Sequence, residues 1–234
     1  MARPDSSHPD VATIAELLGN APRAAMVTSL MGDFARPASE LAAIAGVSRP
    51  TASEHLARLV AHDLLTVERV GRNAYYRIAG RQVAELVESL AVIAPVAPPT
   101  SLRSARLLTT LGYARTCYRH LAGRVGVALA DALRAQKLVR QVHNGLEVDR
   151  DRWDERRPLG LAATVRRGEK QPAIKGCVDW SERRHHLAGS LATSLTERMF
   201  QLEWIARAPG HPRAVVVTAE GLTGLRGEFG LAVR

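Results

Sequence analysis

Helical periodicity and strand-like alternation follow one another along the first part of the chain. Apolar residues recur every three or four positions, the spacing of amphipathic helices, along residues 11–30, 38–46, 49–62 and 81–94. A break near Gly19–Pro22 divides the first of these stretches into two helices. Residues 64–80 instead alternate with a period of two around Gly71, Arg72 and Asn73, which predicts a β-hairpin.

The two middle helices are separated by a tight turn. Gly46 is a C-terminal stop for the first helix, and Ser48 can cap the second, in whose first turn Pro50 is tolerated. Asp63 follows the second helix and can adopt the left-handed conformation there. Helices joined by a short turn, then a hairpin and a closing helix, predict a winged helix-turn-helix over residues 10–94.

The helix after the turn has two unlike faces. Its apolar stripe consists of Ala52, Leu56, Leu59 and Val60, and its opposite face carries Arg49, Thr51, Ser53, Glu54 and Arg58. An ordinary amphipathic helix would leave that face solvated, but small polar residues also let a helix enter the major groove and reach base edges. The hairpin adds cations for the phosphate backbone at Arg69, Arg72 and Arg77. We therefore predict that this unit binds double-stranded DNA.

The charge of the chain favours the same partner. A formal net charge of +9 points to a polyanion, with nucleic acid ahead of an anionic membrane surface. No stretch approaches the about 20 apolar residues of a membrane span, and the N-terminal residues lack the apolar segment of a signal peptide. Two cysteines are too few for a disulfide scaffold. We expect a cytoplasmic protein without a membrane partner.

About the first 95 residues resemble the ArsR/SmtB family of bacterial transcriptional repressors. The resemblance rests on "SRPTASEHLARL", followed by "LL" and then "GRNAYYRI" in the hairpin. It implies a homodimer formed by the first and last helices of the unit, bound to an inverted-repeat operator and released by an effector. The family's recognition positions match Ser48, Arg49, Thr51, Ser53, Glu54 and His55, and its wing tip matches Arg72.

The usual metal-sensing residues of that family are absent. The helix that reads "SELAAIAGVS" has no thiol, and the helix that reads "RQVAELVESL" has no histidine. We interpret His55 and His62 as structural residues rather than metal ligands.

A second domain is expected beyond a proline-rich linker at residues 95–100. Within residues 101–234, the segments 117–139 and 183–205 align without a gap, and each runs into a strand-like stretch. Charged residues 149–176 between them predict a long loop with at most one short helix. The region resembles the C-terminal half of longer ArsR-type regulators, which carry "CxxHLAG" and "CxDWxERRxHLAG". We predict a mainly α protein with small β-hairpin wings, in which a degenerate tandem winged-helix-like domain follows the first unit.

Both cysteines lie at equivalent edges of the two repeats, each with a histidine nearby. Approximate symmetry would bring together Cys117, His120, Cys177 and His186. Three interpretations remain open: a Cys₂His₂ metal site, a thiol pair that oxidises to a disulfide, or ordinary core residues and helix caps. A separate hypothesis is a pocket for an acidic small molecule, lined by Tyr118, Trp180, Arg183, Phe200 and Trp204.

The most specific prediction is a homodimeric DNA-binding repressor whose second domain senses a metal, redox or small-molecule effector. No cofactor is required for DNA binding. The alternative is an architectural, nucleoid-associated DNA binder without an effector. An enzyme is not expected, because the sequence has no phosphate loop, nucleophile elbow or paired catalytic carboxylates.

Overall fold

The computed structural model describes residues 8–96, 98–143, 145–163, 173–209 and 211–233. Residues 1–7, which carry the start of the segment expected not to be a signal peptide, and residues 164–172 of the expected long loop lie outside these ranges. The chain forms two compact units, residues 1–87 and 88–234. The division falls inside helix α5, ahead of the proline-rich stretch, because Glu88 is buried in an ion pair with Arg213, 2.6 Å away.

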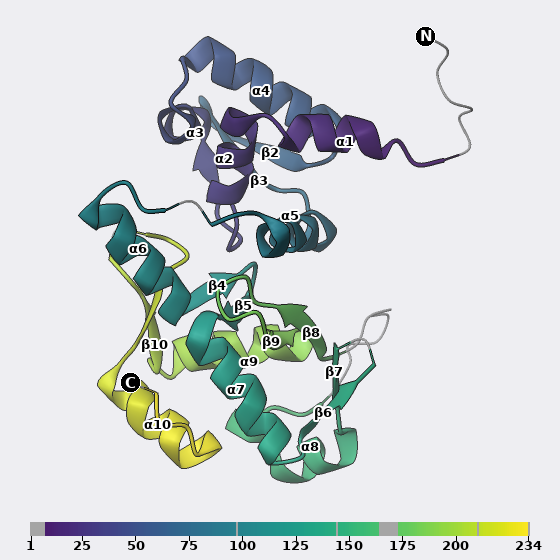
Figure 1. Cartoon of the computed structure of the whole chain (residues 1–234), viewed down its shortest axis with the longest axis vertical. Helices are drawn as coiled ribbons and strands as arrows, with labels where there is room; N and C mark the ends of the chain where they lie inside the picture. The colour runs from purple at the N-terminus through teal and green to yellow at the C-terminus, as the bar shows by residue number, and fades with distance from the viewer. Residues whose placement is uncertain (1–7, 97, 144, 164–172, 210, 234) are drawn as a thin grey trace. The chain divides into compact units, whose positions relative to one another are not determined.

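The first unit is the predicted winged helix-turn-helix. Its elements are α1 (Val11–Leu18), α2 (Ala21–Ser29), β1 (Arg36–Pro37), α3 (Ala38–Ala45), α4 (Arg49–Ala61), β2 (Leu65–Val70), β3 (Asn73–Ile78) and α5 (Arg81–Ile93) (Figure 1). The break between α1 and α2 and the hairpin turn at Gly71 and Arg72 lie where the sequence predicts them. Strand β1 was not predicted, since two residues are too few to show an alternating pattern. It pairs with β3 and makes the wing a three-stranded sheet.

The apolar stripe of α4 builds the core of this unit. Ala52, Leu56 and Leu59 are fully buried, and they are joined there by Leu17, Met26 and Leu41 from the other helices and by Leu30 and Met31 from the turn after α2. Each buried aliphatic side chain contributes about 1.5–3 kcal/mol. Because this stripe faces inward, the polar face of α4 is turned outward.

The second unit runs twice through hairpin, helix, hairpin and helix. After α6 (Leu102–Tyr113), the first run is β4 (Arg115–Cys117), β5 (His120–Ala122), α7 (Gly123–Ala135), β6 (Val139–Val142), β7 (Gly145–Val148) and α8 (Arg150–Arg156). A 3-10 turn at Pro158–Gly160 follows. The second run is β8 (Lys175–Val178), β9 (His185–Ala188), α9 (Ser190–Gln201), β10 (Ile205–Arg207), β11 (Val215–Val217) and α10 (Ala219–Phe229).

Each run therefore has two hairpins where the sequence indicated one strand pair. The additional hairpins, β4–β5 and β8–β9, have strands of only three or four residues, too short for alternation to be visible. The glycine of each His-Leu-Ala-Gly motif lies where a hairpin strand leads into a helix. Both glycines have a positive φ, 79° at Gly123 and 102° at Gly189, which other residues adopt at a cost.

The two runs pack across one another. Helix α7 of the first run contacts β9 of the second, while α9 contacts β5 (Figure 1). Two ion pairs also connect the two runs. Arg119 of the first run pairs with Glu197 of α9, and Arg184 of the second run pairs with Asp131 of α7, both at 2.7 Å. Strands β5 and β9 also contact each other, so the two short hairpins lie at the centre of the unit. Within the described ranges, no helix is both long and apolar enough to cross a membrane.

Candidate functional site

The turn between α3 and α4 has the geometry that its residues predict. Gly46 has a φ of 65° and ends α3 in the left-handed conformation. The Ser48 hydroxyl accepts a hydrogen bond from the Thr51 amide at 3.3 Å and lies 2.8 Å from the Thr51 hydroxyl. Asp63 follows α4 with a φ of 54°, the conformation expected of it. These local bonds hold the first turn of α4 at the outer surface.

Ser48→Ala is expected to loosen that first turn. The substitution leaves a helix-terminal amide without its acceptor, which costs about 1 kcal/mol. Hydrogen exchange of the first-turn amides of α4 should therefore accelerate about fivefold. Ser53→Ala is the matched control, because this exposed serine lies inside the same helix and is not a cap. Equal exchange in both variants would show that the cap does not stabilise the turn.

The outward face of α4 and the wing carry the candidate DNA contacts. Most of the side chains are exposed, namely Ser48, Arg49, Ser53, Glu54, Arg58, Arg69, Arg72 and Arg77, while Thr51 and His55 are half-buried. Arg58 is occupied by an ion pair with Glu16 at 3.0 Å, and Arg77 donates to the Asp33 carbonyl at 3.2 Å. Nδ1 of His62 lies 2.9 Å from the Arg58 carbonyl at the end of α4. Within the part of the chain that the structure describes, Arg49, Arg69 and Arg72 form no ion pair.

Four further candidate residues meet at the centre of the second unit. Cys117 lies opposite His120 in the β4–β5 hairpin, and Cys177 lies opposite His186 in the β8–β9 hairpin. The two sulfur atoms are 4.0 Å apart, and the imidazole ring centres are 5.2 Å apart. Cys117, His120 and His186 each offer a ligand atom within 4.8 Å of the others. All three are buried, whereas Cys177 is half-buried.

Asp179 lies beside this cluster and accepts hydrogen bonds from several buried groups. It was not among the residues predicted from the sequence. Its carboxylate accepts from Nη2 of Arg115 at 2.9 Å, from the Gly123 amide at 2.6 Å and from the amide and hydroxyl of Ser181 at 3.0 and 2.7 Å. Nδ1 of His186 lies 3.4 Å from its Oδ2. Asp179 and Arg115 are both fully buried. The one available signal was the position of Asp179 between Cys177 and Trp180 in the quoted "CxDW" motif.

The surroundings of Cys117, Cys177 and His186 shift the pKa values of these residues in opposite directions. Burial raises the pKa of Cys117 well above its usual value, and the adjacent Cys177 adds to the effect. The pKa of Cys177 is lowered to about 5, chiefly by its contact with Cys117 and, despite opposing burial, also by His186. Burial would lower the pKa of His186, but Asp179 and then Cys177 raise it to about 9. These directions favour a thiolate at Cys177 next to an imidazolium at His186.

The carboxylate of Asp179 stays ionised in the same surroundings. Its burial alone would raise its pKa, but His186, Arg115, Ser181 and the Gly123 amide together hold the pKa far below the usual range. A permanently negative group is therefore fixed beside one histidine of the cluster.

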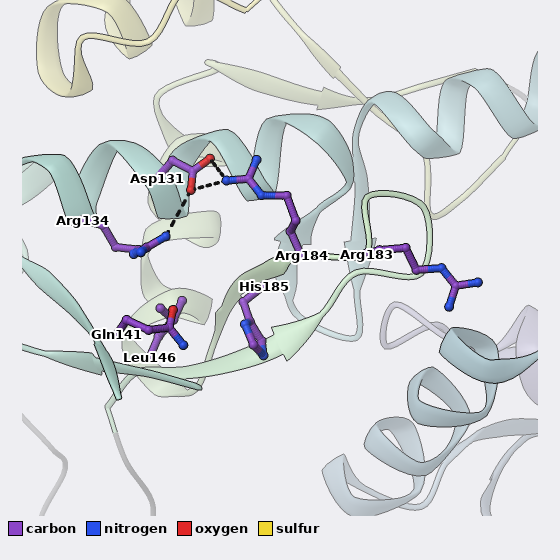
Figure 2. Close-up of a pocket in the computed structure, with 7 residues that line it drawn as sticks. All are labelled: Asp131, Arg134, Gln141, Leu146, Arg183, Arg184 and His185. Carbon is purple, nitrogen blue, oxygen red and sulfur yellow. Dashed lines mark hydrogen bonds and ion pairs between the residues drawn. The ribbon is translucent and has the colours of Figure 1, made fainter. Parts of the chain in front are cut away.

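The residues expected to line an aromatic pocket contact separate partners. Trp180 stacks on Arg115, Phe200 on Arg207, and Trp204 packs against the glycines of α10. A pocket of about 240 Å³ between α7, the β6–β7 hairpin and the β8–β9 turn includes Arg183 but none of the aromatic residues. Figure 2 shows Arg184 reaching across this pocket to Asp131. The aromatic pocket for an acidic ligand stays a prediction.

Comparison with known proteins identifies the first unit and extends over both. A family model described as a helix-turn-helix domain matches residues 13–68, from α1 into β2. The chain is 39% identical over 214 residues to the uncharacterized HTH-type transcriptional regulator YdfF of Bacillus subtilis, covering 92% of this chain and 94% of YdfF.

Two solved structures similar to this chain cover 40% and 38% of it. A homodimeric winged helix-turn-helix DNA-binding domain from Mycobacterium bovis, described as a possible ArsR-family regulator, is 30% identical over 40% of this chain and 89% of its own, with a TM-score of 0.35. The transcriptional repressor BigR of Xylella fastidiosa is 25% identical over 38% and 89%, with a TM-score of 0.34. The match to YdfF spans nearly all of both chains, and so this chain belongs to the family of helix-turn-helix transcriptional regulators that includes YdfF.

Proposed function

We propose that this chain is a homodimeric repressor of the ArsR type, released from an inverted-repeat operator by an effector that its second unit senses. The observation that carries the proposal is the outward face of α4, whose short polar side chains lie beside a basic wing. Residues 10–94 are the DNA-binding and dimerisation domain in this proposal, 95–100 are a linker, and 101–234 are the sensing domain.

Helix α4 enters the major groove in the proposed complex. Ser53 and Glu54 reach base edges, while Arg49 and the N-terminal amides of the helix meet phosphates. The wing places Arg69 and Arg72 on the flanking backbone or in the minor groove. An inverted repeat follows from two-fold symmetry, since two such units read two equivalent half-sites.

Apolar side chains on α1 and α5 support the proposed dimer. Val11 of α1 is 71% exposed, and α5 exposes Leu86, Leu90 and Ile93. A large apolar surface left open to water costs free energy, which pairing of these helices between two copies would recover. This is the pairing that the family resemblance implies.

Selection from a randomised duplex library tests DNA recognition. The full chain should enrich an inverted repeat and bind it at least about 10³-fold more tightly than random duplex in fluorescence anisotropy. The slope of log affinity against log salt should be about −0.9 for each phosphate contacted. Native mass spectrometry of the complex should show two chains for each duplex.

Two results would contradict the proposal. Tight binding without enrichment would favour the architectural DNA binder, and binding that does not respond to salt would argue against phosphate contacts altogether. Because library selection is done without an added effector, it tests DNA recognition separately from sensing.

A further inference from the structure

We propose that Cys117, His120, Cys177 and His186 form a binding site for one thiophilic transition-metal ion of tetrahedral preference, with Zn²⁺ as the first candidate. The ion would supply the effector class that the proposed function leaves open, and this regulatory role rests on that proposed function. Metal binding itself does not depend on DNA. The site lies apart from the helices of the first unit where the family's sensors carry their thiols and histidines.

The spacing of the donors fits a tetrahedral ion. With zinc–sulfur bonds of about 2.3 Å, two thiolates on one ion lie about 3.8 Å apart. The sulfur atoms of Cys117 and Cys177 lie 4.0 Å apart, and the ligand atoms of Cys117, His120 and His186 all fall within 4.8 Å of one another. Cys177 lies outside this group of three, so binding as the fourth ligand requires its side chain to move toward the two imidazoles. Two sulfur and two nitrogen donors favour Zn²⁺ over the oxygen-seeking Mg²⁺ and Ca²⁺.

Asp179 is placed to orient one of the proposed metal ligands, His186, without binding the metal itself. Its Oδ2 lies 3.4 Å from Nδ1 of His186, which leaves Nε2 as the nitrogen for a metal. Histidine ligands commonly donate their second N–H to a carboxylate, which fixes the tautomer and orients the ring. Five hydrogen bonds from neighbouring groups in turn hold the Asp179 carboxylate, so its position does not depend on His186.

The buried Nε2 of His186 is the independent sign of a ligand. The histidine is fully buried, and neither of its ring nitrogens has a partner of full hydrogen-bond geometry among the described residues. Cys177 lies close enough to His186 to raise the pKa of that histidine, by a side-chain contact as well as by charge. A buried polar atom without a partner costs about 1–3 kcal/mol, which coordination would remove. Cys177 is half-buried and provides a route of entry from solvent.

The arrangement also joins the two runs of the second unit. Each short hairpin contributes one cysteine and one histidine as a cross-strand pair, and β5 contacts β9. An ion held by both hairpins would link the runs at their centre, so that its binding energy becomes stability of the unit. The pocket around Asp131 is a weaker candidate, because Arg184 and Arg134 already pair with Asp131 and Arg183 donates to the Val92 carbonyl.

Titration of the reduced, metal-free full chain with Co²⁺ tests the site directly. Co²⁺ replaces Zn²⁺ in tetrahedral sites and gives a visible absorption band together with thiolate-to-metal charge transfer. We expect one Co²⁺ per chain, displaced by one Zn²⁺. Cys177→Ser and His186→Gln should each weaken Co²⁺ binding at least tenfold. His185→Gln is the matched control, because this neighbouring histidine points from the opposite face of β9 into the pocket of Figure 2.

A second measurement needs no variant and so does not depend on the folding of altered chains. Equimolar Zn²⁺ should slow the alkylation of Cys177 in the native wild-type chain at least tenfold, and a chelator should restore the rate. Failure to bind Co²⁺ or to protect Cys177 would overturn the proposal. So would a mass loss of two hydrogens under mild oxidant in a chain that binds no metal, which would identify a dithiol switch.

The regulatory role is measured separately on the selected DNA. Zn²⁺ at a concentration that fills the wild-type site but not that of Cys177→Ser should weaken operator binding at least fivefold in the wild type and leave the variant unchanged. A chain that binds Co²⁺ at the site while its operator affinity stays constant would overturn the effector role and leave the metal site in place. A chain that binds metal but selects no DNA would instead contradict the proposed function.

Discussion

Asp179→Ala is expected to lower the free energy of unfolding of the second unit by about 3–5 kcal/mol. The carboxylate forms a fully buried ion pair with Arg115 at 2.9 Å and accepts a hydrogen bond from the Gly123 amide at 2.6 Å. Removing it leaves the Arg115 guanidinium in the core without a counter-charge, and the α7 N-terminus without an acceptor. The loss of a buried partner costs more than the pair contributes, since the remaining charge stays desolvated.

Tryptophan fluorescence during urea unfolding measures this effect without interference from the first unit. The chain has three tryptophans, and all of them lie in the second unit, at Trp153, Trp180 and Trp204. Asp131→Ala is the matched control, because it removes a half-exposed carboxylate from an ion pair with Arg184 and should cost less than about 1 kcal/mol. Similar unfolding midpoints for the two variants would show that Asp179 does not stabilise the core.

The double variant Asp179→Ala, Arg115→Met separates the buried charge from the lost hydrogen bonds. If the unpaired Arg115 guanidinium accounts for most of the lost stability, adding Arg115→Met to Asp179→Ala should recover part of the free energy of unfolding. If the second substitution adds its own full cost, the hydrogen bonds to Gly123 and Ser181 would be the larger contribution.

The first unit was predictable because its signals are local. Gly46, Ser48 and Asp63 each perform a backbone role that depends only on their neighbours, and the structure finds all three in that role. The apolar stripe of α4 spans enough turns for its period to be read. Strand β1 could not be predicted, because its two residues form a strand only by pairing with β3, which lies far along the chain.

The second unit was less predictable because its structure depends on contacts between its two runs. The strands of β4–β5 and β8–β9 are too short to show a period, yet they place each cysteine opposite a histidine. Sequence equivalence alone suggested that Cys117, His120, Cys177 and His186 meet. Nothing local indicated that Asp179 would be buried, because its partners Arg115 and Gly123 lie in the other run.

Substitutions on α4 and on the wing are expected to weaken DNA binding in different ways. Ser53→Ala combined with Glu54→Ala should weaken binding to the selected inverted repeat about 10- to 100-fold, because the proposed complex loses two side chains that contact bases. Binding to random duplex should stay the same or tighten, since Glu54 also repels phosphates. Both side chains are exposed, so the variant should fold normally. Equal weakening on both DNAs would mean that this face only positions the helix.

Arg72→Ala should weaken binding to selected and random duplex by the same factor and reduce the salt slope by about 1 for each wing, because a phosphate contact carries no sequence information. Arg140→Ala is the matched control for the loss of one positive charge. Arg140 is an exposed arginine in the β6–β7 hairpin of the second unit, paired with Glu147. Unchanged binding in this control, with the loss confined to Arg72, would assign DNA contact to the first wing. Equal losses would show that both hairpins lie on the DNA, so that the second unit takes part in binding in addition to its proposed sensing role.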